Sequence, residues 1–428
     1  MTAMTDKEKF SVSRFQSLLR IKTVSGDEAC RDEFARFLPI LRELYPIVFN
    51  ELNCEVIGDF GLLIRWPGRK SAKAPVVFAA HQDVVACDEE KWTYPPFAAE
   101  IHEGAVWARG SVDTKCIISA LMDAAESLIS SGFRPERDIY FAFGADEEVF
   151  GGTMPKIVET LKNRGVKPRF VLDEGGALLT ELPMGINESF AMVAVAEKAY
   201  GTLHLAMSNK NGKTAPERIS EAVDIIKKHP MKSQLAPAVR EMLRRLGPYA
   251  KPALRPVLKN ISLFAPAVKK VMDGNDDTRP MIQSSITFHK VHALPEENRA
   301  EATFRLKLNP WDSFEDVKAH VAGLLDADAE ITVDIKSGGA PVSPWNGSEF
   351  EYIEKLIRKV FKAHTSPFVL DGGTDARHFA PVCGKIYRFG AFNMSTAMRQ
   401  SVHRENERMP IASFLEGIKF YREFIKGL

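Results

Sequence analysis

The sequence predicts an α/β fold, a mixed, mostly parallel sheet flanked by helices and interrupted by an inserted α+β domain. From about residue 10 to residue 195, short apolar runs alternate with amphipathic helical segments, which is the pattern of βαβ units. Near residue 196 this pattern changes to alternating strands and helices typical of an antiparallel sheet, and after about residue 336 the first pattern returns. We therefore expect one discontinuous domain, 1–196 with 337–428, and an insert at 197–336.

Periodicity predicts the individual segments in order along the chain. In the first part, apolar residues at helical spacing predict a helix over 116–129. In the insert, alternating apolar residues predict strands, and a further amphipathic run predicts a helix; the strands cover 202–207, 284–291, 300–308 and 330–335, and the helix covers 314–325. The stretch 231–270 is basic and contains several prolines. The last part predicts a helix over 349–363, a strand over 385–389 and a closing helix over 411–425.

Composition excludes some classes of protein. A net charge of +1 argues against a broad electrostatic attraction to nucleic acid or to an anionic membrane. The five cysteines are an odd number without C-x-x-C spacing, so we expect neither a disulfide framework nor a thiolate metal site, and a reducing, cytoplasmic location. The first ten residues are polar, and no apolar run approaches the length of a membrane span. We expect neither export nor a membrane partner.

Hard metal ligands follow three of the predicted strands directly. Because the carboxyl ends of parallel strands meet at one edge of a sheet, these side chains are expected to lie together. Two histidines and several carboxylates are the ligand mix of a pair of zinc-like cations. The candidates, with two residues from outside the strands, are His81, Asp83, Glu147, Glu148, Asp173, Glu174, Asp113 and His403. Together they predict a metal-dependent hydrolase.

The spacing of these residues suggests different roles. His81 and Asp83 are two apart, so on an extended strand they share a side, and one can bind metal while the other orients it. Asp113 is the best candidate for a carboxylate shared by two cations, although it could also serve only as the N-cap of the next helix. Single histidines such as His403 are more often ordinary loop residues, and the metal interpretation depends on the whole set.

Two acidic pairs pose a choice between ligand and base. Glu147 and Glu148 are adjacent, so from an extended segment they point to opposite sides. We assign Glu148 as a metal ligand and Glu147 as the general base that takes a proton from the attacking water and returns it to the leaving nitrogen. The pair Asp173 and Glu174 poses the same choice, which the spacing alone leaves open.

Five motifs in order resemble the M20 metallopeptidases over nearly the whole chain. They are HQDVV, KWTYPPFAAEIHEGAVWARGSVDTK, DEEVFGG, LDEGG and the tail GGTDARHF…VHRENE. The phrases APVSPWN and GGTDARHFAPVCGKIYRFG are most similar to the branch of carboxypeptidase S-like enzymes and N-acyl-amino-acid hydrolases. The resemblance implies two Zn²⁺ per chain, with Co²⁺ or Mn²⁺ as substitutes, and it implies that the insert 197–336 is a lid through which two chains form a homodimer.

The resemblance also assigns the residues. It implies that Asp113 bridges both ions, that Glu148 and His403 complete one site, and that His81 with Glu174 completes the other. Asp173 remains the alternative to Glu174. Glu147 takes the position of the general base, and Asp83 lies behind His81.

The chain departs from the family pattern in the lid. Family members usually carry a histidine in a lid loop that stabilises the oxyanion of the tetrahedral intermediate, and this chain has no histidine in the corresponding segment 208–216. His292 stands where the family commonly has asparagine, so His292 or Lys213 is the candidate for the missing donor. Both could equally be ordinary surface residues.

An enzyme that reads a free α-carboxylate needs a cation, and arginine does this through two parallel hydrogen bonds. Arg377 is the main candidate, with Gly373 and Thr374 in the same turn; Arg299 and Arg305 are weaker ones. We expect cleavage of the amide bond before a C-terminal amino acid of a small peptide or N-acyl amino acid. The alternatives are an N-acyl-amino-acid deacylase, a dipeptidase, and a catalytically silent metal-binding scaffold whose lid is an interaction module.

Overall fold

The computed structural model describes residues 4–428 and divides into two compact units. The first comprises the chain up to Ala194 with Ser343–Ser366 and Thr374–Leu428, and the second comprises Val195–Val342 with Pro367–Gly373. From the sequence we assigned residues 367–373 to the discontinuous first domain, as part of 337–428. This segment belongs to the second unit because Asp371 forms ion pairs with Lys198 at 2.8 Å and Lys307 at 2.5 Å.

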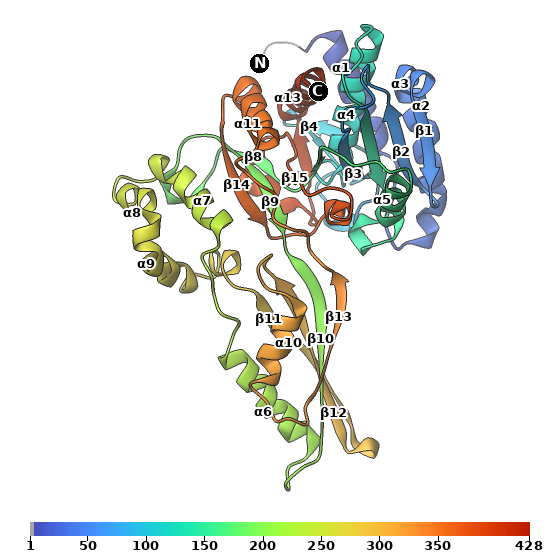
Figure 1. The fold of residues 1–428 in the computed structure, drawn as a ribbon. Coiled ribbons are helices and arrows are strands. Elements are labelled where there is room, and N and C mark those ends of the chain that lie inside the picture. Colours follow the sequence, from blue (N-terminus) through green and yellow to red (C-terminus); the bar gives the residue numbers. More distant parts are fainter. Residues whose placement is uncertain (1–3) are drawn as a thin grey trace. The chain divides into compact units, whose positions relative to one another are not determined.

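The first unit is built on a mixed sheet in the order β1-β2-β6-β3-β7-β15-β9-β14, with β8 beside β9 (Figure 1). The four strands β6, β3, β7 and β15 are parallel to one another, and antiparallel strands lie on either side of them. The expected α/β fold with a parallel centre is therefore confirmed. The strands of this sheet and of a smaller one in the same unit are β1 (Asn53–Ile57), β2 (Gly61–Trp66), β3 (Val76–His81), β4 (Glu100–His102), β5 (Ala105–Trp107), β6 (Ile139–Gly144), β7 (Phe170–Asp173), β8 (Ala177–Leu179), β9 (Phe190–Glu197), β14 (His364–Leu370), β15 (Ile386–Arg388) and β16 (Arg408–Pro410). The last residues of β9 and β14 already belong to the second unit.

Helices cover both faces of this sheet, as its strands require. Along β3, Val77 and Ala79 pack in a cluster with α5, whereas Phe78 on the opposite face contacts Tyr421 and Phe424 of α13. Strands buried on both faces are typical of a parallel sheet, which explains their continuous apolar sequence. The helices of this unit are α1 (Asp6–Leu19), α2 (Arg31–Leu44), α3 (Pro46–Glu51), α4 (Lys115–Ser130), α5 (Thr153–Asn163), α11 (Ser348–Phe361), α12 (Thr396–Ser401) and α13 (Ile411–Lys426).

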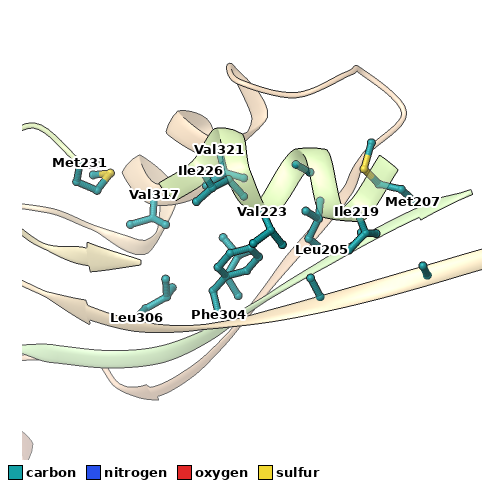
Figure 2. Close-up of a cluster of buried hydrophobic side chains, with 14 of the residues drawn as sticks. Leu205, Met207, Ile219, Val223, Ile226, Met231, Phe304, Leu306, Val317 and Val321 are labelled. Carbon is teal, nitrogen blue, oxygen red and sulfur yellow. The ribbon is translucent and has the colours of Figure 1, made fainter. Parts of the chain in front are cut away.

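The second unit contains an antiparallel sheet in the order β11-β12-β10-β13. Alternate side chains of β10 and β12, such as Leu205 and Phe304, point to one face and pack under α6 and α10, where Ile219 and Val223 meet them (Figure 2). The elements are β10 (Ala199–Ser208), α6 (Ala215–Lys228), α7 (Pro237–Leu246), α8 (Arg255–Lys259), α9 (Ile261–Asp273), β11 (Ser285–Leu294), β12 (Arg299–Leu308), α10 (Phe314–Ala322) and β13 (Glu330–Ser337). All four strands expected in the insert are present.

Capping residues set the beginnings of two helices in this unit. Thr214 accepts a hydrogen bond from the backbone nitrogen of Glu217, whose side chain returns to the backbone of Thr214. Ser313 and Asp316 form the same reciprocal arrangement at the start of α10. Among residues 4–428, none of the helices is long and apolar enough to cross a membrane.

Candidate metal centre

The three strand ends singled out in the sequence do meet at one edge of the sheet. β3 lies between β6 and β7, with His81 directly opposite Gly144 in the parallel register. Glu147 and Glu148 follow β6 in a short 3-10 helix, Glu147–Val149, and Glu174 comes immediately after β7. The topology thus gathers residues from distant parts of the chain in one place.

Two clusters of ligand atoms share the carboxylate of Asp113. In the first, His81 Nε2 lies 3.2 Å from Asp113 Oδ1 and 3.7 Å from Glu174 Oε1. In the second, His403 Nε2 lies 3.0 Å from both Asp113 Oδ2 and Glu148 Oε2. Within each cluster the ligand atoms lie within 4.8 Å of one another. The two oxygens of Asp113 therefore face different histidines.

The donor set fits two small divalent cations. Each cluster offers one imidazole nitrogen and carboxylate oxygens, the donors that zinc takes in catalytic sites. Burial and the nearby charge of Asp113 raise the pKa of Glu174 well above its ordinary value, and the same two causes raise that of Glu148. Among the described residues, Glu148 Oε1 is buried without a hydrogen-bond partner. Ionised carboxylates crowded in this way require positive charge beside them.

Asp83 supports both clusters from behind. His81 Nδ1 lies 3.0 Å from the backbone oxygen of Asp83 and 3.3 Å from its carboxylate, which leaves Nε2 directed at Asp113 and Glu174. The other carboxylate oxygen accepts hydrogen bonds from the hydroxyl of Ser25 and, at 3.1 Å, from the backbone nitrogen of Glu148. Asp83 thereby fixes the ring of one cluster and the backbone of the other.

Glu407 holds the backbone beside Asp113, a role that the sequence analysis missed. Its fully buried carboxylate accepts hydrogen bonds from the backbone nitrogens of Val112 at 2.6 Å and Asp113 at 3.1 Å, and it pairs with Arg109 at 2.7 Å. The partners lie almost 300 residues away in the sequence, so no local pattern indicates them. Only its place four residues after His403 could have drawn attention to it.

Glu147 is buried beside the clusters without belonging to either. Burial, reinforced by the charge of Glu148, raises the pKa of Glu147 to about 8. Arg377 Nη1 lies 3.7 Å from Glu147 Oε1. A carboxylate with a raised pKa can take up a proton near neutral pH, which is what a general base requires.

Asp375 is a second buried acid that the sequence analysis did not select. Burial and the carboxylate of Glu147 raise the pKa of Asp375 well above its ordinary value. It fills space that Gly144 leaves open, because a Cβ at Gly144 would lie 2.4 Å from Asp375 Oδ2. The glycine at the end of β6 therefore has a packing reason that could not be recognised from the sequence.

Of the acidic pair after β7, Glu174 contributes the oxygen near His81, and the cluster does not include Asp173. Asp173 is buried at the end of β7, and the backbone nitrogen of Phe389 donates to its carbonyl oxygen at 2.7 Å. The structure thus brings together His81, Asp113, Glu148, Glu174 and His403, with Glu147 and Asp83 around them.

Arg377 is less available than the sequence suggested. Its side chain is buried, and its guanidinium donates a hydrogen bond to the backbone oxygen of Thr374. The central carbon of the guanidinium, Cζ, lies 5.3 Å from the centroid of the Phe150 ring. Thr374 is also buried, and it caps the 3-10 helix Asp375–Phe379. Both therefore help to shape the surroundings of Glu147, and Gly373, which precedes them, is half-buried.

The lid candidates all lie in the second unit. His292 is exposed on β11, opposite Glu301 of β12. Lys213 forms an ion pair with Glu221 at 2.6 Å. Arg299 pairs with Glu330 at 2.8 Å, and Arg305 is exposed on β12. The clusters described above are formed within the first unit alone.

Comparisons with a family model and with individual proteins point to the same family of peptidases. Residues 77–427 match the model of Peptidase family M20/M25/M40. The probable carboxypeptidase S-like 2 of Dictyostelium discoideum is 28% identical, with 100% of this chain and 86% of that protein covered. The N-fatty-acyl-amino acid synthase/hydrolase PM20D1 of Xenopus tropicalis is also 28% identical, with 100% and 88% covered.

Solved structures share the fold at low sequence identity. The M20 family metallo-carboxypeptidase Sso-CP2 from Sulfolobus solfataricus superposes with a TM-score of 0.67 at 16% identity, with 99% of each chain covered. Human carnosine dipeptidase 1 gives a TM-score of 0.67 at 14% identity, with 98% of this chain and 95% of that chain covered.

Proposed function

The chain belongs to peptidase family M20/M25/M40 and is a hydrolase, and on this basis we propose that it is a dinuclear zinc enzyme that cleaves the amide bond before a C-terminal amino acid. The substrates are small peptides or N-acyl amino acids. One observation carries the proposal: the two oxygens of Asp113 face His81 and His403 separately, so one carboxylate joins two groups of ligands.

The proposed ligands divide between two ions. His81, Asp113 and Glu174 hold one, and Asp113, Glu148 and His403 hold the other. We choose Glu174 over Asp173 because its oxygen lies 3.7 Å from His81 Nε2. Mixed nitrogen and oxygen donors favour zinc, and Co²⁺ or Mn²⁺ is the proposed substitute. When bound, the two ions supply Lewis acidity at the scissile carbonyl.

Around the ions, the protein's own residues move the proton and hold the geometry. Glu147 takes a proton from the attacking water and delivers it to the leaving nitrogen. Arg377, 3.7 Å from Glu147, limits how far its pKa rises, since a nearby cation favours the ionised form. Asp83 keeps His81 in the tautomer with Nε2 free to bind.

Two related substrate classes, small peptides and N-acyl amino acids, fit this proposal. Relatives are named as a carboxypeptidase and as an N-fatty-acyl-amino acid synthase/hydrolase. Val149 and Phe150, directly after the Glu147–Glu148 pair, are 50% and 45% exposed. Apolar side chains beside the proposed base favour a substrate with an apolar acyl or side-chain group. This supports the N-acyl-amino-acid deacylase as the second candidate, ahead of a dipeptidase.

The remaining expectations concern the assembly. We assign dimerisation to the second unit and the missing oxyanion donor to His292, with Lys213 as the alternative. We propose a reducing, cytoplasmic location, based on the odd number of cysteines without C-x-x-C spacing. The proximity of Glu147 to both clusters argues against the silent scaffold.

A panel of substrates tests this proposal. The metal-loaded protein is assayed with N-acyl amino acids of short and long acyl chain, N-blocked dipeptides and free dipeptides, and again after chelation and after return of Zn²⁺. We expect hydrolysis of the first two classes that is lost with chelator and restored by Zn²⁺. Turnover of free dipeptides alone, or turnover unaffected by chelation, would contradict it.

A further inference from the structure

The charge of the chain is distributed unevenly. Residues 231–270 contain nine lysines and arginines and one acidic residue, Glu241, which gives this segment a net charge of +8. The whole chain has a net charge of only +1, so the other residues carry an excess of negative charge. The net charge of the whole chain argued against attraction to anionic membranes or nucleic acid, but that argument does not hold for this segment. A local surface of this charge attracts an anionic partner.

This segment and the three residues after it form three helices, α7, α8 and α9, that contact one another (Figure 1). Each of these helices has buried apolar side chains, among them Leu246, Leu258, Ile261 and Met272. α9 therefore has one face committed to packing, and its opposite face is exposed.

The exposed face of α9 is apolar. Leu263 is 76% exposed and Val271 is 73% exposed, and Ala267 lies between them at i+4. Residues at this spacing share one side of a helix, so they form a continuous stripe, and Phe264, 37% exposed, lies beside it. Large apolar side chains exposed in a row, unlike single ones, indicate a contact surface.

Cations border this stripe. Lys270 is exposed on the same face as Leu263, seven residues away, and Lys251 and Lys259 are exposed on the approach to α9. Within residues 4–428, these three lysines form no ion pair. Lys269, by contrast, is paired with Asp273 at 2.8 Å. Apolar side chains bordered by free lysines are the features of a helix that lies in the interface of an anionic bilayer.

We propose that α8 and α9 dock the enzyme on the surface of an anionic lipid membrane, with Leu263, Phe264 and Val271 inserted among the acyl chains and Lys251, Lys259 and Lys270 at the phosphates. A second copy of the chain fits less well, because two segments of net charge +8 repel each other. Nucleic acid explains the lysines and leaves the apolar stripe without a role.

The test uses sedimentation of the full chain with vesicles of phosphatidylcholine, alone or partly replaced by phosphatidylglycerol. We expect binding to the anionic vesicles only, weakened by salt. The double variant Leu263→Gln, Val271→Gln should lose this binding, and Lys259→Ala and Lys270→Ala should each lower the partition coefficient about fivefold. The matched control, Val56→Gln with Ile101→Gln, removes exposed apolar side chains of the first unit and should bind like the parent.

Thermal melting and light scattering of the same variants complete the test. The double α9 variant should keep the parent's melting temperature, its oligomeric state and its hydrolysis of a water-soluble substrate, since no α9 residue belongs to the metal centre. Equal sedimentation of parent and double variant would overturn the proposal. So would a change from dimer to monomer with vesicle binding intact, which would make the stripe an interface between copies. Binding to DNA that matches the vesicle binding and survives the double variant would also overturn it.

Discussion

The buried carboxylate of Glu407 accepts a hydrogen bond from the backbone nitrogen of Asp113 at 3.1 Å. The contact joins the loop after His403 to the loop that carries the shared carboxylate. Because Glu407 also forms an ion pair with Arg109, the position of Asp113 depends on a buried ion pair that lies outside both ligand clusters. The geometry of both clusters therefore depends on a residue outside them.

Replacing Glu407 should weaken the metal centre without removing a ligand. Glu407→Gln keeps the shape but leaves Arg109 without its counter-charge, so we expect metal affinity to fall about 10- to 100-fold. Titration with Zn²⁺ against a competing chelator measures this. Glu405→Gln, an exposed neighbour in the same loop, is the control and should bind like the parent. Equal affinities for the two variants would remove the supporting role.

The two adjacent glutamates should separate catalysis from binding. Glu147→Gln should keep both ions and nearly unchanged substrate affinity while kcat falls roughly 10²- to 10⁴-fold, because only the proton transfer is lost. Glu148→Gln should instead lower the metal content, since its Oε2 lies 3.0 Å from His403. Steady-state kinetics with elemental analysis distinguishes the two. The reverse pattern would exchange their roles.

The lid histidine should act only in the transition state. His292→Ala should lower kcat and kcat/KM together, on the order of a hundredfold or more, if His292 stabilises the oxyanion. His289→Ala, an exposed histidine on the same strand, is the control and should leave both constants unchanged. A normal rate for His292→Ala would direct the same test to Lys213.

Mixing experiments decide whether that donor comes from a partner chain. Glu147→Gln and His292→Ala chains, each strongly impaired alone, should recover part of the activity in mixtures shown to exchange subunits, because some heterodimers contain one intact site. A mixture without recovery would mean that each chain supplies its own donor.

Stability in acid should depend on Glu349. Burial alone would raise the pKa of Glu349, but its contacts with Lys385 at 2.9 Å and Arg169 at 3.0 Å lower it to about 2. A lowered pKa in the folded state contributes stability above the ordinary value of 4.5, and this contribution is lost as pH falls from 4.5 towards 2. Denaturant unfolding measured between pH 4.5 and 2 should show a smaller loss of the free energy of unfolding for Glu349→Gln than for the parent. Glu351→Gln, exposed on the same helix, should follow the parent.

The sequence was informative where the chemistry follows from strand order. His81, the Glu147–Glu148 pair and the acids after β7 lie together because β3 lies between β6 and β7, and parallel strands end at one edge. Regular periodicity likewise predicted the strands of the insert within a few residues.

Contacts between residues far apart in the chain, and helices whose apolar periodicity is interrupted, could not be predicted from strand order or periodicity. Glu407 and Asp375 act on residues far along the chain, and the binding of Asp371 to Lys198 moved segment 367–373 into the second unit. The helices α7 to α9 were missed. Pro266 inside α9 interrupts the helical pattern, and the first-turn prolines of α7 and α8, which are compatible with a helix start, were not recognised as such. The burial of Arg377 depends on packing that no spacing reveals.

The number of ions per chain tests the central claim most directly. Elemental analysis of the metal-loaded parent should give two, with one ion or fewer in His81→Ala and in His403→Ala, and a loss at both positions in Asp113→Ala, since its two oxygens face both clusters. Circular dichroism must show that Asp113→Ala remains folded. A parent with one ion per chain, unchanged in Asp113→Ala, would contradict the shared carboxylate and with it the dinuclear centre.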